Sequence, residues 1–216
     1  MPHPYPAASR AALFIAAQDT ADVMDVLRRT KAPGLRIAAR VWRELAKADP
    51  DTGDPLALLP CPFTAVALMD GEPDETLPVL RNLAASIAID IPTSALLLGT
   101  EYSVKVGEGD VLVAMLVRRR SDYSLPAFRE RWLGEHAPFG RDLPVCGYRQ
   151  LHADPQSTPG LPPANRFDGA GIVLFRDLQH VATARSAPEI ARDATRDEMQ
   201  FIDHAASMLV MFQTLT

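Results

Sequence analysis

The sequence is poor in cysteine, which excludes protein classes that depend on a disulfide framework or a zinc cluster. Its two cysteines, Cys61 and Cys146, stand far apart and in no metal-ligand spacing. Proteins of a reducing compartment rarely rely on disulfides. We therefore expect a cytoplasmic protein that folds without a metal or a disulfide.

Neither positive nor negative charge dominates the sequence, and no apolar run is long. The net charge is −5 and charged residues make up 23% of the chain, which leaves no sustained basic surface for phosphate backbones. The apolar run at residues 11–17 is too short to cross a bilayer, and Arg, Asp or Glu interrupts each other apolar segment. The sequence thus predicts a soluble protein with neither nucleic acid nor membrane as a partner.

Several catalytic signatures are also missing. The sequence contains no glycine-rich phosphate loop after a strand, no Gly-x-Ser-x-Gly elbow and no His-Glu-x-x-His pair. Cys146 lacks any spacing that indicates a nucleophile, and a buried structural cysteine is the simpler interpretation. Nothing in the sequence demands a cofactor or a metal.

What the chain does have is a repeated order of elements. Its 216 residues, 47% of them hydrophobic, suffice for one large domain or two small ones. Apolar patterning predicts the order β-α-β-β-α-β on each side of the Gly-Glu-Gly at 107–109. Gly-Leu-Arg at 34–36 and Gly-Tyr-Arg at 147–149 occupy matching places. We predict an α+β fold of two tandem ferredoxin-like units, residues 1–107 and 108–216.

The predicted elements follow from apolar periodicity and from turn residues. Helices are expected between strands, one of them at 77–87 and the last restarting near Pro188. Pro78 is compatible with its helix only in the first turn, because an interior proline removes a hydrogen bond. The predicted strands are residues 12–16, 35–43, 64–68, 95–106, 111–117, 147–152, 170–175 and 208–215.

The helix predicted at 124–143 carries the leading candidate for chemistry. Ser124 is a suitable N-cap, and Trp132, His136 and Phe139 follow at helical spacing on the apolar face. A histidine there can exchange a proton with a bound substrate near neutral pH. The alternative is a core histidine whose ring nitrogen simply bonds a neighbouring carbonyl. Glu135, one position off this face, is expected to pair with Arg131.

The strand at 147–152 gathers three polar side chains on one face. Alternation places Tyr148, Gln150 and His152 together. If this face lines a cavity, they can orient a substrate, and if it faces water, it is an ordinary solvated edge. The matching positions of the first unit are apolar, which favours a covered face in both units; these are Leu35, Ile37 and Ala39.

Two further candidates lie near strand ends. Alternation puts Arg119 on the face of Val113 and Met115, where it could receive a carboxylate or a phenolate, or could be part of a solvated cluster. Asp168 belongs to a common Asp-Gly turn and is a weaker candidate for substrate binding. The proline-rich stretch at 154–163 is either a lid or a passive connector.

At these residues the second half resembles the EthD family of the dimeric α+β barrel superfamily. Its most specific string is Trp-x-x-x-His-Ala-Pro at 132–138. The other matching strings are Val-Arg-Arg-Arg at 117–120, Phe-Arg-Glu-Arg at 128–131, Gly-Tyr-Arg-Gln at 147–150 with His152, Asp-Gly at 168–169, Leu-Phe at 174–175, and Asp-Glu-Met-Gln-Phe at 197–201 with Asp203. The resemblance implies two four-stranded antiparallel sheets that close into a barrel with helices outside. Most relatives build this barrel from two chains, whereas fused halves could build it alone, with a further homodimer possible.

The resemblance also implies a range of activities, including cofactor-free cyclases, dehydratases, isomerases, decarboxylases and monooxygenases that act on aromatic or polyketide-like compounds, besides haem-degrading and non-catalytic members. Our leading hypothesis is a cofactor-independent lyase or isomerase acting on a small hydrophobic, aromatic acid held in the barrel. In this hypothesis His136 moves the proton, and Tyr148 or His152 donates a hydrogen bond to the developing oxyanion. Arg119 binds the anionic group of the substrate. The other residues expected to bind the substrate are Trp132, Gln150 and Asp168. A ligand-sequestering stress-type protein and a cofactorless monooxygenase are the alternatives. The site is expected in the second unit alone.

Overall fold

The computed structural model describes residues 4–17, 20–41, 47–155, 158, 160–162, 166–184 and 188–215. Both halves follow the predicted order of elements. The first half consists of β1 (Ala7–Ile15), α1 (Thr20–Arg29), β2 (Leu35–Arg40), β3 (Ala65–Asp70), α2 (Pro73–Ser86) and β4 (Ala95–Lys105). The predicted strand end at 42–43 and residues 156, 157, 159 and 163 of the proline-rich stretch lie outside the described residues.

The second half repeats this order with its helical segments divided. Its elements are β5 (Val111–Val117), α3 (Leu125–Arg131), the π-helical turn η1 (Trp132–His136), α4 (Ala137–Asp142), β6 (Gly147–Ala153), β7 (Gly169–Phe175), α5 (Leu178–Ala184), α6 (Pro188–Glu198), the 3-10 turn η2 (His204–Ala206) and β8 (Met208–Thr214).

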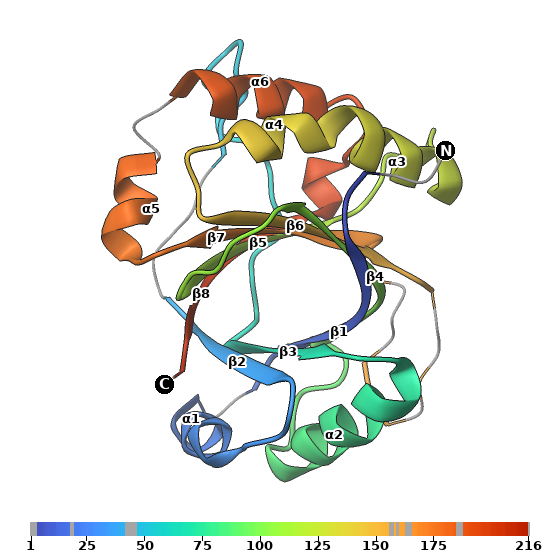
Figure 1. Ribbon diagram of the computed structural model, residues 1–216, viewed down its shortest axis with the longest axis vertical. Coiled ribbons are helices and arrows are strands. Elements are labelled where there is room, and N and C mark those ends of the chain that lie inside the picture. Colours follow the sequence, from blue (N-terminus) through green and yellow to red (C-terminus); the bar gives the residue numbers. More distant parts are fainter. Residues whose placement is uncertain are drawn as a thin grey trace.

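The strands form one closed antiparallel barrel in the order β1-β3-β2-β8-β5-β7-β6-β4. Each half contributes four neighbouring strands, and the halves join where β2 pairs with β8 and β4 pairs with β6. Helices α1 and α2 cover one side of the barrel, and α3 to α6 cover the other (Figure 1). The predicted fold, an α+β barrel with helices outside, is therefore confirmed.

The interior of the barrel is filled with side chains. Phe14, Phe63 and Phe212 are fully buried, and the Phe14 ring lies 5.5 Å from Phe63 and 6.0 Å from Phe212 between ring centroids. Small alanines and branched residues of all eight strands occupy the remaining space. The expectation that a ligand is held inside the barrel is thus wrong, because this space is a packed core.

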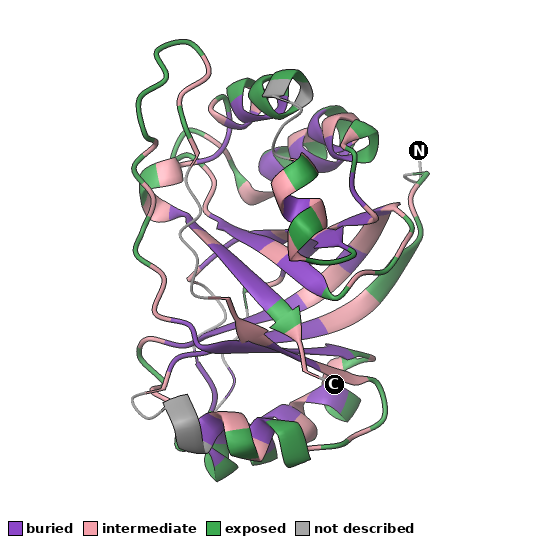
Figure 2. Cartoon of the chain, turned by 90° about the vertical axis from the view of Figure 1, so that its left-hand side faces the viewer, coloured by how far each residue is buried: buried purple, intermediate pink, exposed green. Residues whose placement is uncertain are grey.

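The outer face of each half-sheet packs against helices. In the first half, Ile37 lies with Leu27 and Leu80, and in the second half Met115 lies with Phe128. The helices are buried toward the strands and exposed on their outward sides (Figure 2). The face that Ile37 shares with Leu35 is therefore covered, as predicted from the comparison of the two units.

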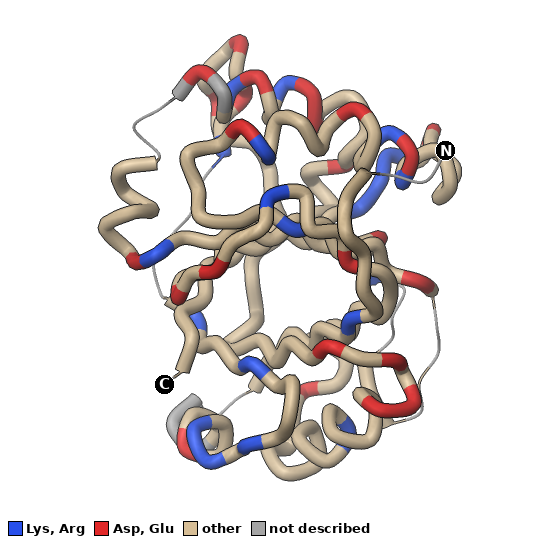
Figure 3. The backbone as a smooth tube through the Cα atoms, in the orientation of Figure 1, with Lys and Arg blue, Asp and Glu red and all other residues tan. Residues whose placement is uncertain are grey.

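One end of the barrel is charged. Arg36 and Arg149, the arginines of the two Gly-x-Arg strings, both pair with Glu108 of the segment that joins the halves. Arg149 and Arg10 also flank the buried carboxylate of Glu101, at 3.6 and 3.2 Å, and burial raises the pKa of Glu101. Charges of both signs accordingly lie on the strands near the barrel opening as well as on the outer helices (Figure 3).

The prediction for Pro78 is wrong. Helix α2 begins at Pro73, with Glu72 as N-cap in a capping box, so Pro78 lies beyond the first turn. Pro78 is exposed, and the carbonyl that loses its intrahelical donor can turn toward water. Among the described residues, no helix is long and apolar enough to cross a membrane.

Candidate active site

A cavity of about 430 Å³ lies between the outer face of the second half-sheet and helices α4 and α6. Its floor consists of β5, β6, β7 and β8, and one wall is η1 with α4. Lys47 and Ala48 from the first half close one side, since residues 47–51 lie beside α6 (Figure 1). The lining residues are Lys47, Ala48, Val113, Met115, Val117, Trp132, His136, Gly140, Leu143, Tyr148, Gly171, Val173, Ala191, Arg192, Ala194, Thr195, Glu198, Ile202 and Leu209.

A π-helical turn places His136 in this wall. Ser124 caps α3 as predicted, accepting a hydrogen bond from the Ala127 amide at 3.3 Å. The predicted single helix at 124–143 is interrupted at residues 132–136 and ends at Asp142. Within this turn Trp132, Leu133 and His136 are all buried. His136 is 4% exposed, which confirms its predicted place on the buried face.

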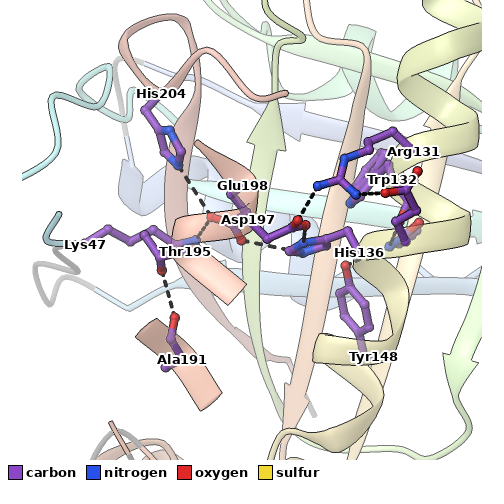
Figure 4. Close-up of polar contacts among 12 residues, drawn as sticks. Lys47, Arg131, Trp132, His136, Tyr148, Ala191, Thr195, Asp197, Glu198 and His204 are labelled. Atoms are coloured by element: carbon purple, nitrogen blue, oxygen red, sulfur yellow. Dashed lines mark hydrogen bonds and ion pairs between the residues drawn. The ribbon is translucent and has the colours of Figure 1, made fainter. Parts of the chain in front are cut away.

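His136 is held by carboxylates from α6. Its Nδ1 lies 2.8 Å from Oδ2 of Asp197, and its Nε2 lies 3.8 Å from Oε1 of Glu198 (Figure 4). A carboxylate accepts hydrogen bonds, so Nδ1 of His136 donates to Asp197, and in the neutral form of the ring the lone pair then lies on Nε2. The guanidinium of Arg131 donates to Asp197 and also forms the predicted pair with Glu135.

Glu198 is ionised although it is buried. Burial by itself raises the pKa of this carboxyl, but the charge of Lys47 and the hydrogen bonds with His204 and Lys47 lower it to about 2, and His136 adds to this lowering when its ring is protonated. Lys47 forms an ion pair with Glu198, and Nε2 of His204 lies 3.4 Å from Oε2 of Glu198 (Figure 4). The cavity wall therefore carries a fixed negative charge beside His136.

Glu198→Gln is expected to remove a pH-dependent part of the stability. The pKa of about 2 in the fold lies below the value of 4.5 for an unperturbed glutamate, so the ionised carboxylate stabilises the fold above pH 4.5. This contribution, on the order of 3 kcal/mol, disappears as the pH falls from 4.5 toward 2.

Urea unfolding of wild type and variant near pH 6 and near pH 3 measures this difference. The gap between their free energies of unfolding should be large at the higher pH and small at the lower. Glu189→Gln, an exposed carboxylate on the same helix, makes the same change in charge and serves as control. A gap that is constant across this pH range would contradict the assignment.

Tyr148 lines the cavity from β6 and belongs to a buried network. Nε2 of Gln150 donates to the Tyr148 hydroxyl at 3.0 Å and to the Trp132 carbonyl at 3.1 Å. Burial raises the pKa of Tyr148, and hydrogen bonds with the side chains of Gln150 and Trp132 oppose this by less. The phenol is therefore protonated, and its hydroxyl points toward the His136 ring (Figure 4).

The structure places His152 and Gln150 behind the cavity wall. Nε2 of His152 lies 3.1 Å from Oε1 of Gln150, and the imidazole stacks on the indole of Trp132 with centroids 4.7 Å apart. Trp132 thus separates His152 from the cavity. Gln150 is fully buried and lies outside the lining, where its amide connects Tyr148 with His152. The predicted polar face exists, but only Tyr148 of the three reaches the cavity.

Arg119 and Asp168 lie outside the cavity as well, and they pair with each other. The Asp168 carboxylate accepts from the Arg119 backbone amide at 2.9 Å and forms an ion pair with its guanidinium. Nε of Arg119 donates to the Tyr123 carbonyl at 3.1 Å. Because its donors are used within the fold, Arg119 is not placed to hold a substrate anion, and the two residues connect strand ends instead.

Sequence reasoning missed Asp197, Glu198 and Lys47 as site residues. The Asp-Glu pair belongs to one of the strings that carry the EthD resemblance, which was the available signal. Lys47 lies in the first half, next to a polar turn, and no local pattern marks it. The cavity is therefore not built from the second half alone.

The comparisons with known proteins match this part of the chain. Residues 120–205 match the family model described as the EthD domain, and this range contains His136, Tyr148, Asp197 and Glu198. No curated protein matches.

Three similar solved structures share the whole barrel. An anthrone oxidase-like protein is 11% identical, with 97% of this chain and 92% of that chain covered and a TM-score of 0.53. A haem-binding protein from Thermus thermophilus is 11% identical, with 100% and 95% covered and a TM-score of 0.52. A dye-decolorizing peroxidase from Bacteroides thetaiotaomicron is 5% identical, with 100% and 96% covered and a TM-score of 0.52. At these identities the likeness shows the fold alone. Residues 120–205 are thus similar to the EthD domain, and the chain as a whole has the dimeric α+β barrel fold of these structures.

Proposed function

We propose that the protein is a cofactor-independent enzyme of the lyase or isomerase type that moves a proton on a small hydrophobic, aromatic compound. The observation that carries this proposal is the buried His136, held at Nδ1 by Asp197 and lining an apolar cavity. Such an imidazole has a defined tautomer and one free lone pair, which is what a general base needs.

In the proposed reaction Nε2 of His136 removes a proton from an acidified carbon of the substrate. The imidazolium that forms lies between two carboxylates, Asp197 and Glu198, whose charges stabilise it. Lys47 and Arg131 in turn pair with these carboxylates and hold them in place. His136 then returns the proton to another atom, which completes an isomerisation, or the carbanion expels a leaving group that takes up this proton from His136, which completes an elimination.

Tyr148 is the proposed donor to the oxyanion that develops on the substrate. Its hydroxyl oxygen already accepts from Gln150 at 3.0 Å, so its own hydrogen is available to a ligand. Because the phenol is protonated, it can donate a hydrogen bond directly to the oxyanion. The apolar lining, including Trp132 and Met115, excludes water from the carbanion.

The cavity does not suit haem, the group that the similar protein from Thermus thermophilus binds. Haem iron needs an axial side chain such as an imidazole. Of the described lining residues, His136 alone has an imidazole, and its Nε2 faces the Glu198 carboxylate at 3.8 Å. A macrocycle on Nε2 would press against this ionised group, so we derive no step through haem.

Proton exchange on an aromatic carbon acid tests the proposal without knowledge of the natural substrate. Anthrone and related ketones with an enolisable C–H are incubated with the protein in D₂O under nitrogen, and deuterium incorporation is followed by NMR. We expect incorporation well above the rate in buffer, with no net consumption of oxygen in air. Oxygen uptake that depends on the protein would instead indicate a monooxygenase. Binding of these ketones with no exchange would contradict the proposal in favour of a ligand-binding protein.

A further inference from the structure

Within the part of the chain that the structure describes, the end of the cavity beside His136 offers no unpaired cation to a carboxylate of a ligand. Asp197 and Glu198 line or adjoin it, and the cations that face them, Arg131 and Lys47, are already engaged in ion pairs with these carboxylates. An anionic group of a ligand placed beside His136 would meet these two carboxylates, and both cations at this end of the cavity are already held by them. A ligand that carries a negative charge must therefore hold it elsewhere.

The mouth of the cavity offers a cation. Arg192, Thr195 and Glu198 lie three residues apart on α6 and so share the face of this helix that lines the cavity. Thr195 and Glu198 are buried, whereas Arg192 is exposed, as are its mouth neighbours Ala191 and Ala48. One face of α6 thus leads from the solvent-exposed Arg192 down to the carboxylate at Glu198.

Arg192 differs from the other arginine of this helix. Arg196 pairs with Asp51 at 2.7 Å and with Asp193 at 2.9 Å, and it does not line the cavity. For Arg192, the described part of the chain provides no ion pair. A guanidinium at the rim of an apolar cavity can bind a carboxylate bidentately while the body of the ligand fills the cavity.

We propose that the ligand is an aromatic carboxylate that binds with its carboxylate outward on Arg192 and its ring inward toward His136. This inference rests on the proposed function for the role of His136. It assigns the binding of the anionic group to Arg192 in place of Arg119. Arg192 and Glu198 are six residues apart, or about 9 Å along the helix axis. The carboxylate is consequently a handle at the far end of the ligand from the base, and it is not the group that a decarboxylation would remove.

The test compares two probes of the same shape, 2-naphthoate and 2-naphthamide, by isothermal titration calorimetry at low ionic strength. Wild type is expected to bind the carboxylate about tenfold more tightly than the neutral amide. Arg192→Gln should abolish this preference and leave the affinity for the amide unchanged. Arg196→Gln, the matched control on the same helix, should leave both affinities and the preference as in wild type.

The inference would be overturned if wild type bound the two probes with equal affinity or did not bind 2-naphthoate at all. It would also be overturned if the preference for the carboxylate survived in Arg192→Gln, or if Arg196→Gln lost this preference as well. The proposed function fails separately. If proton exchange is absent while Arg192 still determines the preference for the carboxylate, the cavity binds aromatic acids without chemistry. If exchange depends on His136 but the preference is absent, the ligand is a neutral carbon acid.

Discussion

His136→Asn is expected to lower protein-dependent proton exchange on an aromatic carbon acid by about 10²–10⁴-fold. The side-chain amide of asparagine lies near the position of Nδ1 and can still contact Asp197. Asparagine has no atom at the position of Nε2 that could take up a proton. The loss should appear in the rate at saturating ligand, because His136 acts on the reacting proton and contributes little to the affinity for the aromatic body.

The measurement is deuterium incorporation by NMR, with near-UV circular dichroism and thermal unfolding to show that the variant is folded. His180→Asn is the matched control, since the imidazole of His180 lies on α5, where its Nε2 is 3.1 Å from the Pro144 carbonyl, and it does not line the cavity. Wild-type exchange in a folded His136→Asn protein would exclude His136 from the mechanism. A parallel loss in His180→Asn would show that both changes act through stability.

The strands could be predicted from sequence because they are buried. Residues 111–117 form an apolar run between polar breaks, and β5 has these bounds in the structure. Alternation also correctly grouped Tyr148, Gln150 and His152 on one face. It could not show which face of the sheet lies inside the barrel, because both faces of β6 are covered by apolar groups. The expectation of a ligand inside the barrel was wrong for this reason.

The catalytic geometry was less accessible. Apolar spacing placed His136 on the buried face, but it did not predict the π-helical turn at 132–136, which depends on backbone hydrogen bonds that the spacing of apolar residues does not encode. Asp197 meets His136 only after α6 folds back over α4, and Lys47 arrives from the other half of the chain. Contacts between residues this far apart in sequence result from tertiary packing, so that a single sequence without relatives gives no local signal for them.

Helix α4 packs so closely on β6 that Gly140 is critical for the site. A Cβ on Gly140 would lie 2.1 Å from Cδ1 and Cε1 of Tyr148, far closer than two carbon atoms can approach. Gly140 and Tyr148 are both buried, so the ring could yield only toward the cavity that it lines, away from its hydrogen bond with Gln150. The helix can lie on the Tyr148 ring only because residue 140 has no side chain.

Gly140→Ala is therefore expected to destabilise the protein by on the order of 3 kcal/mol, since the tyrosine must leave its place and its hydrogen bond with Gln150 is lost. Guanidinium unfolding gives the free energy, and proton exchange in the surviving folded protein should fall because the oxyanion donor is displaced. Gly134→Ala is the matched control on the same helical segment, where an added Cβ meets nothing within 4 Å. Alanine there exchanges a flexible residue for a better helix former, so stability should stay within about 1 kcal/mol of wild type or rise. Equal changes in stability in the two variants would mean that helix propensity, and not contact with Tyr148, determines the effect of an added methyl group. The close packing of α4 on Tyr148 would then not be what positions the phenol.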